Sequence, residues 1–535
     1  FGATSLSGVD VTVVAAGNLN ALIAATGNAA ATSTGNLTVS GTATNLATNS
    51  GGTTSFGLTT LSGGLTTTSV GDITQTGAIT TGAPSSITST TGDITLTNPN
   101  NSFFGATSLS GVDVTVVAAG NLNALIAATG NAAATSAGNL TVSGTAVNLA
   151  TNSGGATSFG LTTLTGGLTT VSVGDITQTG AITTGAPSSI SSSTGDITLT
   201  NPGNSFFGTT SLVATLGDLS FAGSVAGSLA TTSGGATSFG LTTLTGGLTT
   251  TSVGDITQTG AITTGAPSSI SSSTGDIALT NPGNSFFGAT SLTATLGDLG
   301  FAGSVAGSLT TTSGGATSFG ATTLTGGLTT TSVGDITQTG AITTGAPSSI
   351  TSTTGDIVLT NPANSFFGAT ALSGVDVTVV AAGDLNALIA ATGNAAATSS
   401  GNLTVSGTAV NLATNSGGTT SFGVTTLTGG LTTTSVGDIT QTGAITTGAP
   451  SSITSTTGDI TLTNPGNSFF GATSLSGGDV TVVAAGNLNA LIAATGNAAA
   501  TSSGNLTVSG TAINLATNSG GTTSFGVTTL TGGLT

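Results

Sequence analysis

Aspartate is the only ionisable side chain in this sequence, so any acid–base or metal chemistry must use it. All 17 acidic residues are aspartates, and lysine, arginine, histidine and cysteine are absent. Without histidine or cysteine, catalytic triads of the usual kinds cannot form. A glycosidase could run on two carboxylates alone. An active site, however, breaks the surrounding pattern, and these aspartates recur in nearly the same turn context, as in Gly92-Asp93-Ile94-Thr95. We therefore expect no catalytic residue and no enzymatic activity.

Asp72, Asp93 and Asp113 follow one another at nearly equal intervals. If they stack in neighbouring turns of the chain, the repulsion is ~1–3 kcal/mol for each neighbouring pair. Relief would come from solvent, backbone N–H groups, raised pKa values or bound Ca²⁺. We expect solvated turn aspartates that accept backbone hydrogen bonds, with Ca²⁺ at these columns as the alternative. The calcium-binding nonapeptide G-G-x-G-x-D is absent.

Asp384 is the one charge outside this pattern, and it replaces the asparagine found at positions 18, 121 and 487. We interpret it as a turn residue. No cofactor-binding or metal-binding residue is assigned.

The overall charge of -17 narrows the possible partners. A chain without cationic side chains cannot neutralise phosphates, which excludes nucleic acids and attraction to anionic membranes. No apolar run approaches the ~18 residues of a membrane span. The sequence begins at Phe1 and stops at Thr535 in mid-pattern, so we expect an excerpt of a longer chain.

The sequence is built from internal repeats that begin with FGATSL or a close variant. Long and short spacings between them alternate in blocks, in the order long, long, short, short, long. We assign the repeats as 1–103, 104–206, 207–286, 287–366, 367–469 and a partial 470–535, within one continuous domain, 1–535.

A smaller unit lies inside the repeats, marked by glycine, then aspartate, asparagine or glycine, then an alternating segment. The marker begins at Gly71, Gly92, Gly111, Gly138, Gly154 and Gly174. This count gives five units of about 20 residues in the long repeat and four in the short one. The difference in length between the two repeats is therefore predicted to be one whole unit.

The alternation of aliphatic residues with threonine is the period-2 pattern of a half-buried strand, and glycine or Asn-Pro ends each run. Weak helix formers dominate the chain, and Asn20–Thr26 is too short for a stable helix. We predict an all-β fold, a parallel β-solenoid of about 20 residues and three short strands per coil. About 26 such coils at ~4.8 Å would make a rod of roughly 125 Å.

In this solenoid Ile73, Ile94 and Val114 should stack inside, with Leu140 one coil later. Phe103 and Phe104 are both expected to fill the interior. An outward column is expected from Thr74, Thr95, Thr115 and Thr141.

The cycle NPxNSFFGATSLSG(V)DVTV, GNLTVSG, GGTTSFGxTTLTGGLTT, VGDITQTGAITT and GDITLTNP resembles the repeats of filamentous haemagglutinin-like exoproteins, bacterial surface proteins of the two-partner-secretion type. The resemblance covers the whole chain. It implies a right-handed parallel β-helix at the cell surface, without catalytic residues in its shaft.

These observations favour the structural shaft of an extracellular bacterial fibre or giant adhesin, self-associating end to end or laterally, protease-resistant and suited to a biofilm matrix. The main alternative is an adhesive module that binds a glycan or a partner along a Thr/Asn-rich face. A minor alternative is an ice-binding surface, for which Thr74-x-Thr76 and Thr95-x-Thr97 would form ranks that Thr115-x-Val117 interrupts.

Overall fold

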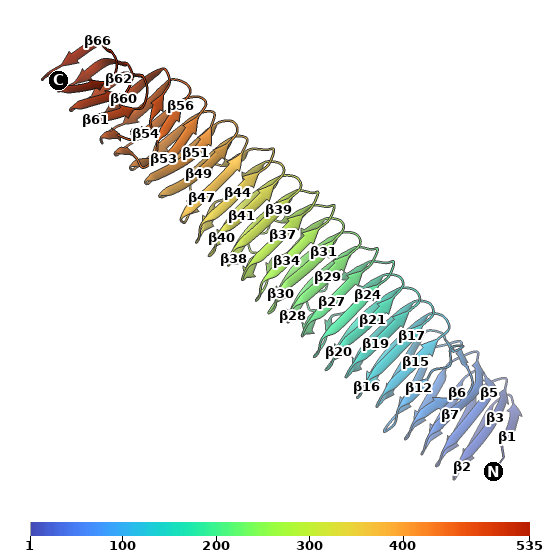
Figure 1. The fold of residues 1–535 in the computed structure, drawn as a ribbon. Helices are drawn as coiled ribbons and strands as arrows, with labels where there is room; N and C mark the ends of the chain where they lie inside the picture. Colours follow the sequence, from blue (N-terminus) through green and yellow to red (C-terminus); the bar gives the residue numbers. More distant parts are fainter. Residues whose placement is uncertain (1) are drawn as a thin grey trace. The chain divides into compact units, whose positions relative to one another are not determined.

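The computed structural model describes residues 2–535 and divides into two units, one ending at Ile270 and the other beginning at Ser271. The described residues form 66 strands and no helix, and hence no helix long and apolar enough to cross a membrane. Each unit is a parallel β-solenoid, in which a strand pairs with strands one coil before and one coil after it (Figure 1). The predicted fold class is confirmed in both units. One continuous rod stays a prediction.

A coil holds two or three strands. Runs of coils with two continuous sides are interrupted by pairs of coils in which one side is split into two short strands, as in β9 (Ile73–Gln75) with β10 (Ile79–Thr81). The strands of one long repeat are β7 (Thr54–Leu61), β8 (Leu65–Ser69), β9 (Ile73–Gln75), β10 (Ile79–Thr81), β11 (Ser85–Ser89), β12 (Ile94–Leu96), β13 (Ser102–Phe103), β14 (Ala106–Gly111), β15 (Val114–Ala118), β16 (Leu122–Ala128), β17 (Ala132–Ser136), β18 (Leu140–Ala146) and β19 (Leu149–Ser153).

The length of a coil follows from the strand register. Leu37 pairs with Thr54 across a short coil, whereas Thr80 pairs with Ser102 across a longer one. The average is about 19 residues per coil. The predicted size of the unit is therefore confirmed.

Side chains alternate between the interior and the solvent along each strand. In β12, Ile94 and Leu96 are fully buried and Thr95 between them is exposed. Ile94 lies between Ile73 of the preceding coil and Val114 of the following one. Each such aliphatic side chain stabilises the unit by ~1.5–3 kcal/mol. The parallel ladders meanwhile pair the backbone groups from coil to coil.

The predicted step from Val114 to Leu140 is wrong. Val114 pairs with Ala132, and Leu140 lies on the other sheet, between Leu122 and Thr157. Thr141 moves with it and does not continue the threonine column. The cause is that both corners of the coil carry the same glycine–asparagine or glycine–aspartate sequence, so the marker passes from one corner to the other without a change of pattern.

The long repeat consequently winds five and a half turns. From Ile73, five register steps lead to Leu168, and Ile176, the copy of Ile73, lies half a coil further on, in the other sheet. The short repeat takes four full steps, from Ile176 to Ile256. The long repeat therefore winds one and a half turns more than the short one, and the predicted difference of a single coil is wrong.

The strand TSFGLTTL and its copies show the same alternation of sides. In the first unit β7 and its copy one long repeat later, β20 (Thr157–Leu164), lie in different sheets, whereas β30 (Thr237–Leu244), one short repeat further on, stays in the sheet of β20. In the second unit β40 (Thr317–Leu324) and β53 (Thr420–Leu427) again lie in different sheets. The long spacing thus changes the side, and the short spacing keeps it.

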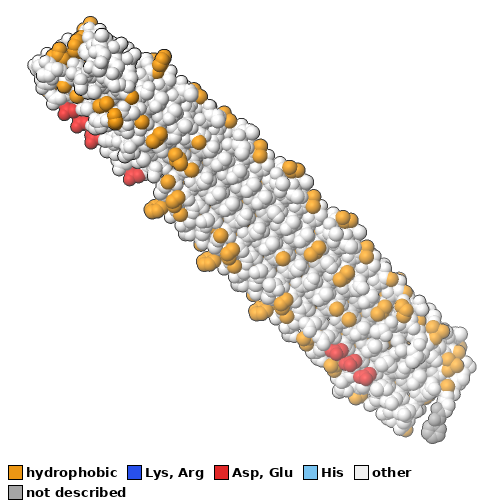
Figure 2. All heavy atoms as spheres, in the orientation of Figure 1, with side chains coloured by type: hydrophobic (Ala, Val, Ile, Leu, Met, Phe, Trp, Pro, Cys, Tyr) orange, Lys and Arg blue, Asp and Glu red, His pale blue; other side chains and the backbone are white. Residues whose placement is uncertain are grey.

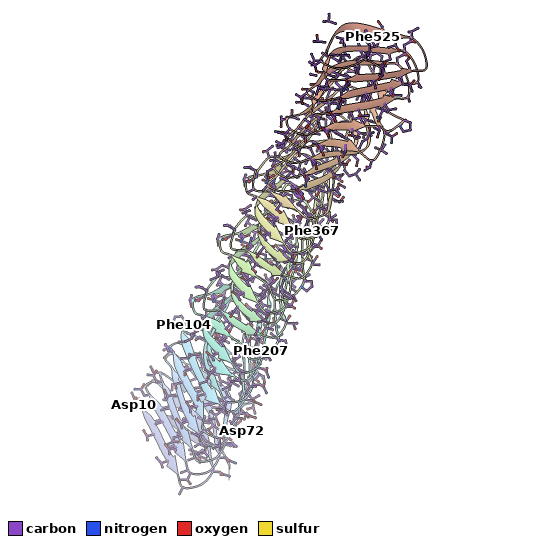
Figure 3. The ribbon with its side chains drawn as sticks, turned by 90° about the vertical axis from the view of Figure 1, so that its left-hand side faces the viewer. Asp10, Asp72, Phe104, Phe207, Phe367 and Phe525 are labelled. Atoms are coloured by element: carbon purple, nitrogen blue, oxygen red, sulfur yellow. The ribbon has the colours of Figure 1, made fainter. Side chains whose placement is uncertain are left out.

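The expectation for the paired phenylalanines is half confirmed. Phe103 is 5% exposed inside the solenoid, but Phe104 is 67% exposed. Adjacent residues of an extended chain point to opposite faces, so both rings could not enter the interior. Figure 3 shows Phe104 and its copy Phe207 on opposite sides of the first unit, as the half-turn requires.

A buried amide network holds the corner that contains the Asn-Pro sequence. Asn101 is fully buried, and its side-chain amide donates to Gln75 Oε1 at 2.8 Å and to the carbonyls of Leu96 and Val117. Its Oδ1 accepts Gln75 Nε2 at 2.8 Å and the backbone N–H of Ile79 at 2.9 Å. Five hydrogen bonds satisfy this amide completely, which is what its burial demands.

Candidate functional surfaces

The aspartate column lies at a corner of the coil, directly before the strands. Asp72 Oδ1 accepts the backbone N–H of Asp93 at 3.0 Å, and Asp93 Oδ1 accepts the N–H of Asp113 at 3.0 Å. Figure 2 shows aspartate side chains in short rows on the surface. The expectation that these turn aspartates accept backbone hydrogen bonds is confirmed, and each of these bonds joins the carboxylate to the next coil.

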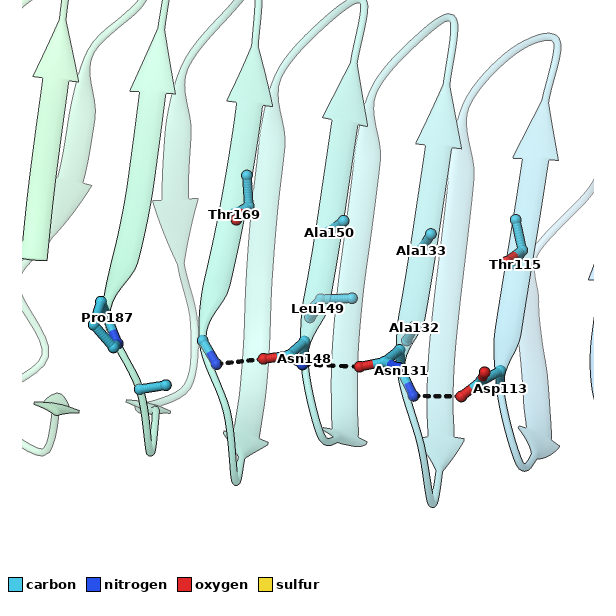
Figure 4. Close-up of a pocket in the computed structure, with 12 residues that line it drawn as sticks. Asp113, Thr115, Asn131, Ala132, Ala133, Asn148, Leu149, Ala150, Thr169 and Pro187 are labelled. Atoms are coloured by element: carbon cyan, nitrogen blue, oxygen red, sulfur yellow. Dashed lines mark hydrogen bonds between the residues drawn. The ribbon is translucent and has the colours of Figure 1, made fainter. Parts of the chain in front are cut away.

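Asparagine continues the column in the coils that follow (Figure 4). Asp113 Oδ1 accepts the N–H of Asn131 at 2.6 Å, Asn131 Oδ1 accepts Asn148 Nδ2 at 2.8 Å, and Asn148 Oδ1 accepts the N–H of Gly167 at 2.8 Å. Aspartate and asparagine therefore have the same structural role, because the side-chain oxygen of each accepts a hydrogen bond from the next coil.

A shallow groove of about 450 Å³ runs beside this ladder. Its floor consists of Thr115, Ala133, Ala150 and Thr169, which follow one another in register. These small side chains carry no acid–base group, and the groove brings only Asp113 among the carboxylates to its edge. The expectation that the chain is not an enzyme stays a prediction.

No group of three or more acidic or histidine side chains that could hold a metal ion occurs in residues 2–535. The carboxylates of a column follow one another in single file, one from each coil. The alternative of Ca²⁺ at Asp72, Asp93 and Asp113 stays untested.

Asp384 occupies the corner immediately before β49 (Leu385–Ala391). Its Oδ1 accepts the backbone N–H of Asn402 at 2.7 Å, the bond that Asn121 makes to Asn139 at 2.9 Å in the first unit. The interpretation of Asp384 as a turn residue is confirmed.

A second kind of groove, of about 540 Å³, lies beside the exposed Phe470 in the second unit. Polar side chains line it: Asn487 and Asn505 from the corner, and Asn489 and Thr507 from neighbouring strands. Sequence reasoning missed this site because it assigned Phe470, as a copy of Phe104, to the interior. The alternation rule for adjacent residues could have found it.

A flat array of hydroxyl groups covers four neighbouring strands of the second unit, β37 (Thr290–Ala294), β39 (Leu309–Ser313), β41 (Leu328–Ser332) and β44 (Ser348–Ser352). Two columns run across them in register. The columns are Ser291, Thr310, Thr329, Ser349 and Thr293, Thr312, Thr331, Thr351. The ranks expected from Thr74 and Thr95 do not form in this way, because Thr76 and Thr97 lie beyond the ends of β9 and β12.

The fold and these repeated surfaces define a repeat protein of the parallel β-solenoid class. Within that class, the chain belongs to the family described as "Repeats of unknown function (DUF5649)", which matches residues 43–110, 146–213, 216–293, 306–373 and 409–476. No curated protein and no solved structure matches the chain.

The family model matches one part of each long repeat and leaves another part unmatched. Each matched segment contains the strand TSFGLTTL or a variant of it, the aspartate pair that follows and the paired phenylalanines. Residues 111–145 and 374–408 fall between matched segments, and they hold the asparagine- and alanine-rich coils that occur in the long repeats. The match thus covers the aspartate pair and the paired phenylalanines, whereas the asparagine- and alanine-rich coils of these two segments lie outside it.

Proposed function

We propose that the chain is the structural shaft of an extracellular bacterial fibre or giant adhesin, related to filamentous haemagglutinin-type exoproteins. The observation that supports this proposal is the coil-to-coil register, in which strand after strand of each unit pairs in parallel with its neighbour. A solenoid of this kind gains length by adding coils while its cross-section stays constant. Short and long repeats can therefore be combined freely.

The composition supports an exposed, durable shaft. Lysine and arginine are absent, so trypsin has no cleavage site, and the exterior is rich in serine, threonine and asparagine. Electron microscopy of the purified chain is expected to show thin rods, and fibre diffraction an axial spacing of ~4.8 Å. Separate globules joined like beads would refute the shaft.

Self-association, laterally or end to end, is part of the same proposal. Because all charges are negative and only 17 occur in 535 residues, salt should weaken the one force that keeps copies apart. Sedimentation velocity at rising NaCl concentration is expected to show larger species. A chain that stays monomeric at every salt and protein concentration would contradict it.

The location outside the cell is tested by immunogold labelling of intact cells of the source organism. Gold particles at the surface or on released fibres support the proposal, and label confined to the cytosol overturns it.

A second candidate function is an adhesive module that binds a glycan or a partner, which the groove beside Phe470 favours. An ice-binding surface remains a minor candidate. It depends on the hydroxyl array of β37, β39, β41 and β44, and a thermal hysteresis measurement tests it directly.

A further inference from the structure

In three of the long repeats, one phenylalanine ring lies in solvent at the same point of the coil. Phe104, Phe367 and Phe470 are 67%, 66% and 67% exposed. An exposed ring forgoes the stabilisation that burial would give it. The backbone next to the exposed ring is nevertheless tightly constrained. Gly471, with φ +77°, follows Phe470 directly, and a Cβ at that position would lie 2.9 Å from Pro450 Cγ.

The amides beside Phe470 are held in a defined orientation. Asn487 Oδ1 accepts the backbone N–H of Asn505 at 2.8 Å, and Asn505 Oδ1 accepts the N–H of Thr522 at 3.0 Å. With their oxygens engaged in the ladder, these two side chains offer their Nδ2 donors to the groove. Asn489 and Thr507, paired in register and both exposed, add an amide and a hydroxyl group.

The combination selects a class of ligand. The groove contains no charged side chain. The face of a phenylalanine ring is electron-rich and attracts the C–H groups on one side of a pyranose ring. The amide and hydroxyl groups around it match sugar hydroxyls, which both donate and accept. We propose that the groove beside Phe470 binds one ring of a neutral saccharide, stacked on Phe470 and hydrogen-bonded to Asn487, Asn489 and Thr507.

The same arrangement recurs in the other long repeats. Ala106 pairs with Asn123 and Asn123 with Thr141 beside Phe104, and the corresponding steps beside Phe367 lead from Ala369 to Asn386 and Thr404. The registers are those of Ala472, Asn489 and Thr507 beside Phe470. The second unit therefore holds two sites one long repeat apart, on opposite sides of its solenoid.

The site beside Phe367 differs in one group. Asp384 stands in the place of Asn487 and uses Oδ1 for the same backbone bond. Its second carboxylate oxygen is an acceptor where Asn487 offers a donor. This site is expected to prefer a sugar hydroxyl that donates at that position.

The short repeats supply a control within the same chain. Phe207 and Phe287 are also exposed, at 57% and 59%, but they pair with Ala226 and Ala306. No asparagine-rich coil follows them. These two rings lack the amides, so they are expected not to bind a saccharide.

The inference rests on the second candidate function and makes its ligand specific, whereas the shaft does not depend on it. The test uses the full chain and a panel of neutral oligosaccharides, namely maltohexaose, cellohexaose, mannohexaose and lacto-N-tetraose, with heparin hexasaccharide as the charged comparison. Binding is measured by saturation-transfer NMR and calorimetry. We expect at least one neutral oligosaccharide to bind with Kd on the order of 1 mM per site, and heparin not to bind.

Two sets of substitutions test which phenylalanine rings bind the saccharide. Replacing the phenylalanine that begins each long repeat (F1A, F104A, F367A and F470A) should weaken binding about tenfold or more, as loss of a stacked ring does. The matched pair F207A and F287A should leave it unchanged. N489A is expected to weaken the contribution of its own site while Phe470 remains.

The proposal is overturned if no neutral oligosaccharide of the panel binds, if heparin binds as well as they do, or if both sets of ring substitutions weaken binding equally. Rods in electron microscopy together with absent binding would refute the saccharide site and leave the shaft intact. Separate globules in electron microscopy together with saccharide binding would refute the shaft and leave the saccharide site intact.

Discussion

Replacing Asn101 by leucine is expected to open one coil of the first unit while distant coils stay closed. The side chain is fully buried and makes five hydrogen bonds, to Gln75, Ile79, Leu96 and Val117. Leucine has a similar size but no polar atom, so the volume is retained and all five bonds are lost.

The magnitude follows from the partners left behind. The N–H of Ile79 belongs to a fully buried residue, and orphaning it costs ~1–3 kcal/mol. The carbonyl of Leu96 lies in the ladder between β12 and β15, and Gln75 and Val117 are half-buried, so these groups add little. A cost of ~1–3 kcal/mol corresponds to a local opening constant raised between about 5-fold and about 150-fold.

Hydrogen exchange of the full chain, read by mass spectrometry, measures this opening. Asn100 distinguishes the peptide, because its copies are Gly203, Gly283, Ala363 and Gly466. The corner of Asn467 in the second unit makes the same five bonds and serves as the internal reference.

The matched control for this prediction is Asn100→Ala. Ala363 already occupies that position in another repeat, so the exchange of both corners should stay slow. If the peptide that contains Asn100 and position 101 exchanges as slowly in N101L as in the unsubstituted chain, the argument from orphaned buried groups is refuted.

Three further substitutions test single features. Gly144→Ala should destabilise the bulge of β18 by ~3 kcal/mol or more, because φ is +121° and the new Cβ would collide with the carbonyl oxygen of Ile126; in thermal unfolding G120A, with open space around it, is the control. Thr107→Val should leave the free energy of unfolding unchanged or raise it by up to ~1 kcal/mol, because the buried Oγ1 has no hydrogen-bond partner; a clearly lower melting temperature would contradict this. Asp93→Asn should keep the bond to the N–H of Asp113 and reduce the salt dependence of unfolding, whereas D93A loses that bond and should cost ~0.5–1.5 kcal/mol; equal stability of the two variants at low salt would refute the role of the ladder.

The solenoid could be predicted from the sequence because its cause is local. The alternation in Asp93-Ile94-Thr95-Leu96 sets which side chains face inward, and the glycine before it sets the corner. Stacking of Ile73, Ile94 and Val114 followed from their spacing and is what the structure shows.

The number of turns in the long repeat could not be predicted in the same way. The interval from Gly111 to Gly138 is longer than the others, and it marks the point where the marker changes corner. Both corners need a side-chain oxygen that accepts a backbone N–H, so both carry similar residues. Only the strand register, in which Val114 pairs with Ala132, shows which of the two corners a given marker occupies.

The buried amide of Asn101 and the groove beside Phe470 depend on contacts between coils. Gln75 and Asn101 lie far apart in the sequence, and they meet because two coils of different length lie in register. No local pattern contains that information. The exposure of Phe104 was different, since the opposite directions of adjacent side chains already indicated it.

Because the long repeat ends half a turn out of phase, the number of long repeats, odd or even, decides the side of the coil on which later copies lie. Duplicating a short repeat leaves every later copy facing as before, whereas duplicating a long one rotates them all by half a revolution, and a second such duplication restores them. Unequal crossing-over would thereby change the side of the coil on which the later exposed phenylalanine rings lie, without changing any side chain.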